Sequence, residues 1–99
     1  MTSKSSWPFA EPEHVAVFTT RHILDGEAPI LHITHDADDG AWQFLPGFGV
    51  CTDDARVVSL RSILSLDATL AELADLPLGW QAVRATKSEP WSRRPRNEG

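Results

Sequence analysis

The feature that most restricts the fold of this chain is an Asp-Gly pair at residues 39–40, which lies between two segments of alternating hydrophobicity. Ile30–His35 and Ala41–Leu45 both alternate in the way that is typical of half-buried strands. The Asp-Gly pair tolerates the positive backbone φ that a tight hairpin turn requires. We therefore predict a β-hairpin whose second strand places Trp42 and Phe44 together on the buried face.

Two further strands and a pair of helices are expected around this hairpin. Residues 15–19 and 80–84 are rich in β-branched and aromatic side chains, which suit a pleated surface. Apolar residues recur at helical spacing over residues 60–76, on both sides of Asp67. Because Asp competes for amides inside a helix but satisfies them at its start, we expect two short helices with Ser59 and Asp67 as successive N-caps.

The length of the chain, 99 residues, suits a single hydrophobic core. We predict one α+β domain over residues 15–85: a mostly antiparallel sheet of about four strands, short helices packed on one face, and a more polar opposite face. A short helical segment over residues 20–25 would follow the first strand, and Val57-Val58 would form a minimal β-bridge at most. Residues 1–14 are expected to be an extended lead-in, and residues 86–99 a flexible tail rich in Pro and Arg.

Charge and cysteine content restrict the class of protein. The net charge of −5 repels nucleic-acid phosphate and anionic lipid, so we expect neither nucleic acid nor membrane as a partner. The N-terminus lacks the apolar run of a signal peptide, and no run approaches the ~20 apolar residues needed to span a bilayer. The single Cys51 cannot close an intramolecular disulfide and suits a reducing compartment. These features predict a cytoplasmic protein.

The aspartates of the hairpin turn invite a calcium interpretation, which the spacing disfavours. They are Asp36, Asp38 and Asp39. An EF-hand loop needs glycine at its sixth position and glutamate at its twelfth, whereas here the glycine comes one residue early and Gly47 stands at position twelve, counted from Asp36. We expect a solvated turn and no calcium.

Histidine and cysteine could in principle supply a metal site or a nucleophile. His32 and His35, with Asp36 or His22, have the donor atoms that zinc binds. Residues three apart on a strand point to opposite faces, however, so we expect no shared metal and no cofactor. Cys51 would need a histidine beside it to be a nucleophile, and no catalytic motif surrounds it. A metal-binding or thiol-dependent enzyme that uses His32, His35 and Cys51 is therefore the alternative interpretation.

Tryptophans in both flanks are candidates for partner contacts. Trp7 and Trp91 stand next to prolines, outside any core-forming periodicity. Such side chains either fold back over an apolar groove or stay exposed for another protein. We favour folding back, and keep docking of an accessory domain through these flanks as a further alternative.

Several short motifs carry a family resemblance. The segment Asp39-Gly40-Ala41-Trp42-Gln43-Phe44 resembles the D-G-x-W-x-F hairpin of a family of small bacterial proteins, catalogued as a domain of unknown function and grouped with polymorphic-toxin immunity proteins. The chain is similar again at Leu66-Asp67 and at Leu76-Pro77-Leu78-Gly79, so the match covers about residues 15–84. The resemblance implies an α+β fold and a binding function without catalytic residues.

We therefore expect a non-catalytic protein-binding module of the immunity type. The partner would be another protein, such as a basic toxin domain, because the chain is acidic. Its contact residues would be the aspartates of the turn and the flanking tryptophans: Asp36, Asp38, Asp39, Trp7 and Trp91.

Overall fold

The predicted hairpin lies at the centre of the sheet. The computed structural model describes residues 7–49 and 52–96, and in it β2 (His32–His35) and β3 (Trp42–Leu45) pair antiparallel, with Ile33 opposite Phe44. Gly40 has a φ of 75°, a conformation that L side chains rarely adopt. The turn chemistry expected from the sequence is confirmed.

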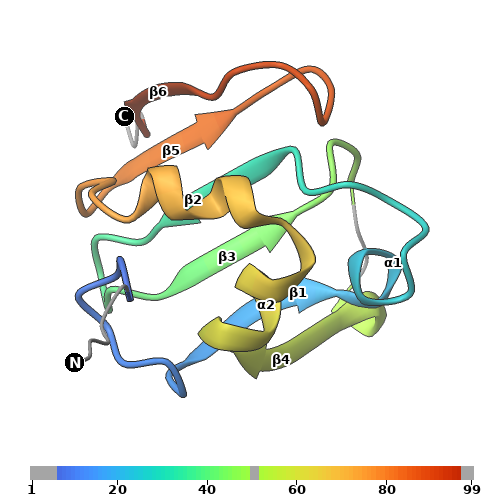
Figure 1. The fold of residues 1–99 in the computed structure, drawn as a ribbon, viewed down its shortest axis with the longest axis horizontal. Coiled ribbons are helices and arrows are strands. Elements are labelled where there is room, and N and C mark those ends of the chain that lie inside the picture. The colour runs from blue at the N-terminus through green and yellow to red at the C-terminus, as the bar shows by residue number, and fades with distance from the viewer. Residues whose placement is uncertain (1–6, 50–51, 97–99) are drawn as a thin grey trace, which may run out of the picture.

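Four more strands extend the sheet to six, in the order β4-β1-β3-β2-β5-β6 (Figure 1). All neighbours are antiparallel except β1 and β3, which are parallel. The remaining strands are β1 (Ala16–Thr20), β4 (Ala55–Ser59), β5 (Trp80–Val83) and β6 (Ser92–Pro95); the helices are α1 (Arg21–Leu24) and α2 (Leu60–Leu66), with 3₁₀ helices η1 (Thr52–Asp54) and η2 (Ala68–Leu73).

The α+β class is confirmed, but the predicted number of strands was too low. Ala55–Ser59 forms a full edge strand on β1 where the sequence suggested only a minimal bridge, and Ser92–Pro95 forms a strand inside the expected flexible tail. Every residue of β6 is exposed. Because none of its side chains is buried, the sequence of this strand shows no alternation of apolar and polar residues. Only its backbone pairing with β5 defines it as a strand.

Two helical segments meet at Asp67, as the sequence predicts. The Ser59 hydroxyl accepts a hydrogen bond from the Ser62 amide (3.1 Å) and caps α2. The Asp67 carboxylate accepts one from the Thr69 amide (3.0 Å) and starts η2. Both segments lie in front of the sheet in Figure 1, so they cover one of its faces.

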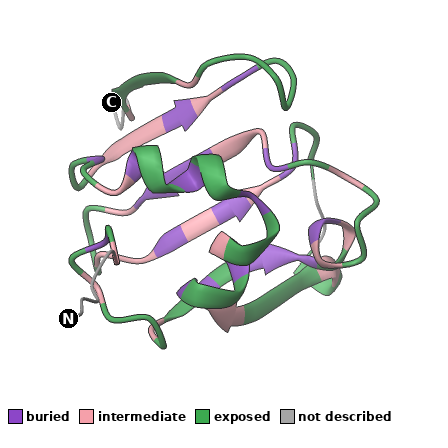
Figure 2. Cartoon of the chain, viewed as in Figure 1, coloured by how far each residue is buried: buried purple, intermediate pink, exposed green. Residues whose placement is uncertain are grey.

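The core lies between this helical layer and the sheet (Figure 2). Trp42 is 1% exposed; its ring stacks on His35, with centroids 3.9 Å apart, and makes a T-shaped contact with Phe9, with centroids 5.2 Å apart. The helical layer contributes four buried leucine and isoleucine side chains, which are Leu60, Ile63, Leu70 and Leu73. Burial of Trp42 and Phe44 on one face is thus confirmed.

One buried ion pair ties the layers together. The Arg84 guanidinium donates to Asp67 Oδ2 (2.6 Å), to the Thr69 hydroxyl (3.2 Å) and twice to the Ile30 carbonyl (2.9 and 3.1 Å). It also donates to the Lys87 carbonyl and lies under the ring of Trp91, 4.1 Å from the centroid. All five of its N–H groups are therefore used, which a buried arginine needs.

We predict that Arg84→Met destabilises the fold by about 3–5 kcal/mol, because it leaves the Asp67 carboxylate buried without its cation. Denaturant unfolding measures the change. Arg61→Met is the matched control, since the Arg61 side chain is 76% exposed and should matter little. Equal effects of the two substitutions would contradict the role given to Arg84.

Acid should weaken the same contact. Burial by itself raises the pKa of the Asp67 carboxyl, but the hydrogen bonds from Thr69 and Arg84 outweigh it and hold the pKa below its usual value. The folded protein therefore binds this proton less readily than the unfolded chain. The stabilisation is complete above the unfolded pKa of about 3.9 and is lost as the pH falls through the folded pKa.

We therefore expect Asp67→Asn to lower stability at neutral pH and to make stability fall less steeply on acidification than in the unmodified protein. Unfolding measured at a series of pH values below neutrality tests this. Asp25→Asn, which alters an exposed carboxylate, should leave the slope unchanged.

Candidate functional site

The two strand histidines point away from each other, as strand geometry predicts. His35 is buried, its Nδ1 lies 2.7 Å from the Leu76 carbonyl oxygen, and its Nε2 lies 3.6 Å from Glu11 Oε2. His32 instead donates from Nε2 to Gln81 Oε1 at 2.9 Å. The structure therefore does not bring these imidazoles together.

The other parts of the alternative enzyme hypothesis are also apart or undescribed. His22 packs edge-on against Phe48, with ring centroids 5.4 Å apart. Cys51 lies outside the described residues. Over residues 7–49 and 52–96, no group of three or more His, Cys, Asp or Glu is placed to hold a metal ion.

The three aspartates of the hairpin turn differ in their contacts. Asp36 accepts hydrogen bonds from Arg96 Nη1 (2.6 Å) and Gln43 Nε2 (3.0 Å), so its charge is largely used within the domain. Asp39 accepts from the Ala41 amide at 3.0 Å and stays exposed, and Asp38 is exposed as well. Asp38 and Asp39 are therefore the charges that this turn presents to solvent.

The flanking tryptophans fold back on the domain at opposite ends of the sheet. Trp7 donates from Nε1 to the Glu11 carbonyl (2.6 Å) and packs near Phe9, at the Trp42 end. Trp91 packs over Arg84, beyond the last residue of β5. Both side chains are half-buried against the core. They do not form one docking surface.

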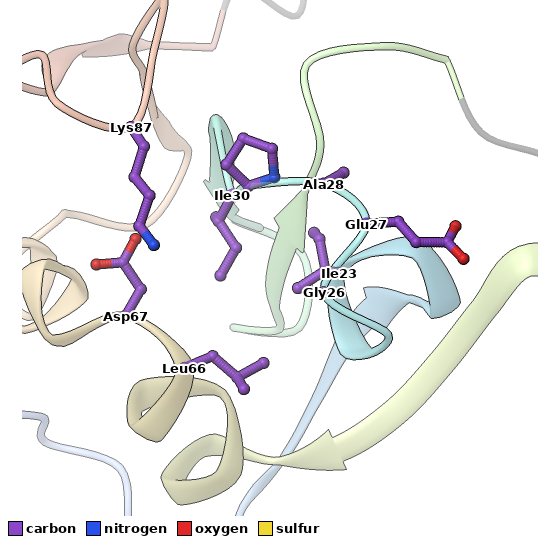
Figure 3. Close-up of a pocket in the computed structure, with 9 residues that line it drawn as sticks. Ile23, Gly26, Glu27, Ala28, Ile30, Leu66, Asp67 and Lys87 are labelled. Atoms are coloured by element: carbon purple, nitrogen blue, oxygen red, sulfur yellow. The ribbon is translucent and has the colours of Figure 1, made fainter.

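A pocket of about 370 Å³ lies on the helical side, where the loop after α1 approaches the start of η2. Figure 3 shows Lys87 pointing toward Asp67 at its mouth, while Glu27 points away. The floor is apolar and includes Ile23 and Ile30. The only buried charged group in its lining, Asp67, is already bonded to Arg84 and Thr69. The pocket therefore offers no buried polar atom that requires a ligand.

The opposite side of the sheet, which we call the open face, carries a different kind of surface. The register places Ile33 beside Phe44 and Ala82 on the helical side, so the residues next to them in each strand point to the open face. One row of paired residues crosses all six strands there. This open-face row consists of Val57, Phe18, Gln43, Thr34, Gln81 and Arg94, in strand order.

The apolar end of the open-face row is exposed to solvent. Val57 and Phe18 are direct partners in the register, and they are 59% and 44% exposed. A hollow of about 360 Å³ lies beside Phe18 and is also lined by Leu45 and Ala55. A second hollow, of about 470 Å³, shares Leu45 but is otherwise lined by other residues, among them Phe48 and Val83. Exposed apolar side chains next to hollows of this size are typical of protein-binding surfaces.

The centre of the row is polar and incompletely paired. Thr34 is 3% exposed, and its hydroxyl has no hydrogen-bond partner in the part of the chain that the structure describes. Gln43 and Gln81 flank it in the neighbouring strands. A buried hydroxyl without a partner costs free energy within the fold. Because its oxygen is enclosed, it is not a contact point for another molecule.

The edges of the sheet are less suited to binding than its face. On β4, Arg56 donates from Nη1 to the carbonyls of Asp53 (2.9 Å) and Ala55 (2.8 Å), which occupies backbone acceptors near the edge. On β6, Pro95 lacks an amide and two arginines precede it. Charged side chains and proline are common means of blocking edge-to-edge pairing.

Compared with models of known protein families, with curated proteins and with solved structures, the chain matches none. Among the described helices, none is long and apolar enough to cross a membrane.

The sequence predicted that the face opposite the helices is the more polar one, but it did not predict the open-face row. The alternation of β3 and β5 does indicate that Gln43 and Gln81 point away from the core. Nothing in the sequence places these residues in line with Val57, because that strand was not predicted and the parallel pairing of β1 with β3 is not encoded locally.

We predict that Thr34→Val leaves the free energy of unfolding unchanged or raises it slightly, because the substitution removes a buried hydroxyl that has no partner. Thr19→Val is the matched control: the Thr19 hydroxyl donates to the Phe44 carbonyl at 2.8 Å, so its loss should destabilise by about 1 kcal/mol. Destabilisation by Thr34→Val would show that its hydroxyl is paired.

Proposed function

We propose that this chain is a cytoplasmic, non-catalytic protein-binding module of the immunity type, which binds and neutralises another protein through its open face. The observation that carries the proposal is the pair of large apolar side chains, Val57 and Phe18, exposed side by side, with a hollow of about 360 Å³ next to Phe18. Burial of such side chains against a partner is the usual source of affinity in protein interfaces. The resemblance of the hairpin to the immunity-type family supports the same function.

The charge of the chain favours a basic partner. The net charge is −5, and Asp38 and Asp39 are exposed at the turn that joins the two central strands. Charges at the rim of an interface accelerate association and select against like-charged partners. The apolar side chains of the open face would then supply the affinity, and the aspartates would accelerate association with a basic partner by electrostatic attraction.

Co-expression with candidate toxins from the same source tests the proposal. One of them should be neutralised, so that cells survive, and should form a complex with the purified protein. Val57→Lys should weaken that complex at least about tenfold, because it places a charge in an apolar contact. Leu66→Lys is the matched control, since Leu66 is 46% exposed but belongs to α2 on the helical side.

Reversing the charge of Asp38 tests whether electrostatic attraction accelerates association. Asp38→Lys should slow association more at low salt than at high salt, because salt screens the attraction. Glu72→Lys, which changes an exposed carboxylate of η2, should have less effect. If no candidate binds, or if binding tolerates Val57→Lys, the proposed function is wrong; if binding ignores only Asp38→Lys, the open face stands and the acidic turn plays no part.

A further inference from the structure

The open-face row changes character from one edge of the sheet to the other. Its first two residues, Val57 and Phe18, are apolar, and its last, Arg94, is cationic. The residues between them carry amide and hydroxyl groups. Because neighbouring strands lie about 4.8 Å apart, Phe18 on β1 and Arg94 on β6 are separated by four strand spacings, or about 19 Å.

The polar groups at the centre have unused hydrogen-bonding capacity of opposite kinds. Gln43 donates from Nε2 to Asp36, which leaves its oxygen without a bond among the described residues. Gln81 accepts at its oxygen from His32, which leaves its Nε2 donors unused within the same residues. The unpaired hydroxyl of Thr34 lies between them. The row thus presents an acceptor on β3 and a donor on β5, with the buried Thr34 between them on β2.

This order of groups matches an amide. A peptide group or a carboxamide donates one N–H, which Gln43 can accept, and offers one carbonyl, which Gln81 can bind. Nucleic-acid bases also combine donors and acceptors, but their phosphates would meet a protein with a net charge of −5.

Arg94 adds a charge at the far end. The other two arginines around β6 are occupied: Arg93 binds Asp75 at 2.8 Å, and Arg96 binds Asp36 at 2.6 Å. Arg94 is exposed, and its side chain makes no hydrogen bond or ion pair with any residue that the structure describes. A free guanidinium is well suited to a carboxylate, which it binds with two parallel hydrogen bonds.

We propose that the open face recognises an extended segment of the partner that carries an apolar side chain, a central amide and a carboxylate, in that order. The segment lies along the open-face row, with the apolar side chain against Phe18 and Val57 and the carboxylate on Arg94. At about 3.3 Å per residue, 19 Å corresponds to about six residues, so the apolar and acidic side chains fall on the same side of the segment. This inference rests on the proposed function and names the chemistry of its partner.

Selection from a phage-displayed library of random peptides on the full chain tests this directly. Peptides that bind the unmodified protein but not Val57→Lys should share an apolar residue and an acidic residue about six positions apart. Selection on Arg94→Glu should replace the acidic residue by a basic one. Selection on Arg61→Glu, which reverses an exposed arginine of α2, should keep the acidic preference.

Gln81→Glu should weaken binding of the selected peptide about fivefold, because it removes the free amide donor. Thr34→Val is the control on the neighbouring strand: its hydroxyl is enclosed, so this variant should bind the peptide as the unmodified protein does, while its stability stays equal or rises. Isothermal titration calorimetry of the selected peptide, with unfolding of the free variants, gives both readouts.

The outcomes distinguish this inference from the proposed function. If the selected peptides depend on Val57 but ignore Arg94 and Gln81, the open face binds proteins and the recognition chemistry assigned to its row is wrong. If no selected peptide depends on Val57, the open face is not the binding surface, and both proposals fail together.

Discussion

The buried contact between Arg84 and Asp67 is the interaction on which the rest of the structure depends. It joins the end of β5 to the corner between α2 and η2, and the same guanidinium holds the Ile30 carbonyl at the entry to the central hairpin. A cation in this position is tolerated only because all of its donors are used. It therefore fixes the helical layer over one face of the sheet, and that choice leaves the opposite face open.

The two faces then follow different rules. On the helical side, Trp42 is enclosed by aromatic rings and by aliphatic side chains from α2 and η2, as close packing requires. On the open face, Val57 and Phe18 stay exposed. Natural folds depart from consistent packing and pairing mainly where function requires it. The open face is therefore where a functional interpretation has physical support.

The hairpin that dominates the sequence contributes to both sides. Its strands carry the buried Trp42 and the polar Gln43 and Thr34, because side chains alternate across a strand. Its turn keeps Asp38 exposed, while Asp36 is held by Arg96. The aspartates of the turn therefore do not form a single charged patch. Asp36 makes an ion pair within the domain, and Asp38 is exposed to solvent.

The sequence by itself determined the elements whose signals are local. The turn at Gly40, the burial of Trp42, and the caps at Ser59 and Asp67 depend on residues close in the chain, and the structure bears each of them out. Only the tertiary structure decided the two outer strands, the use of Asp36 by Arg96, and the alignment of the open-face row. Those features arise from backbone pairing and side-chain contacts between distant segments, which leave no periodic pattern in the sequence.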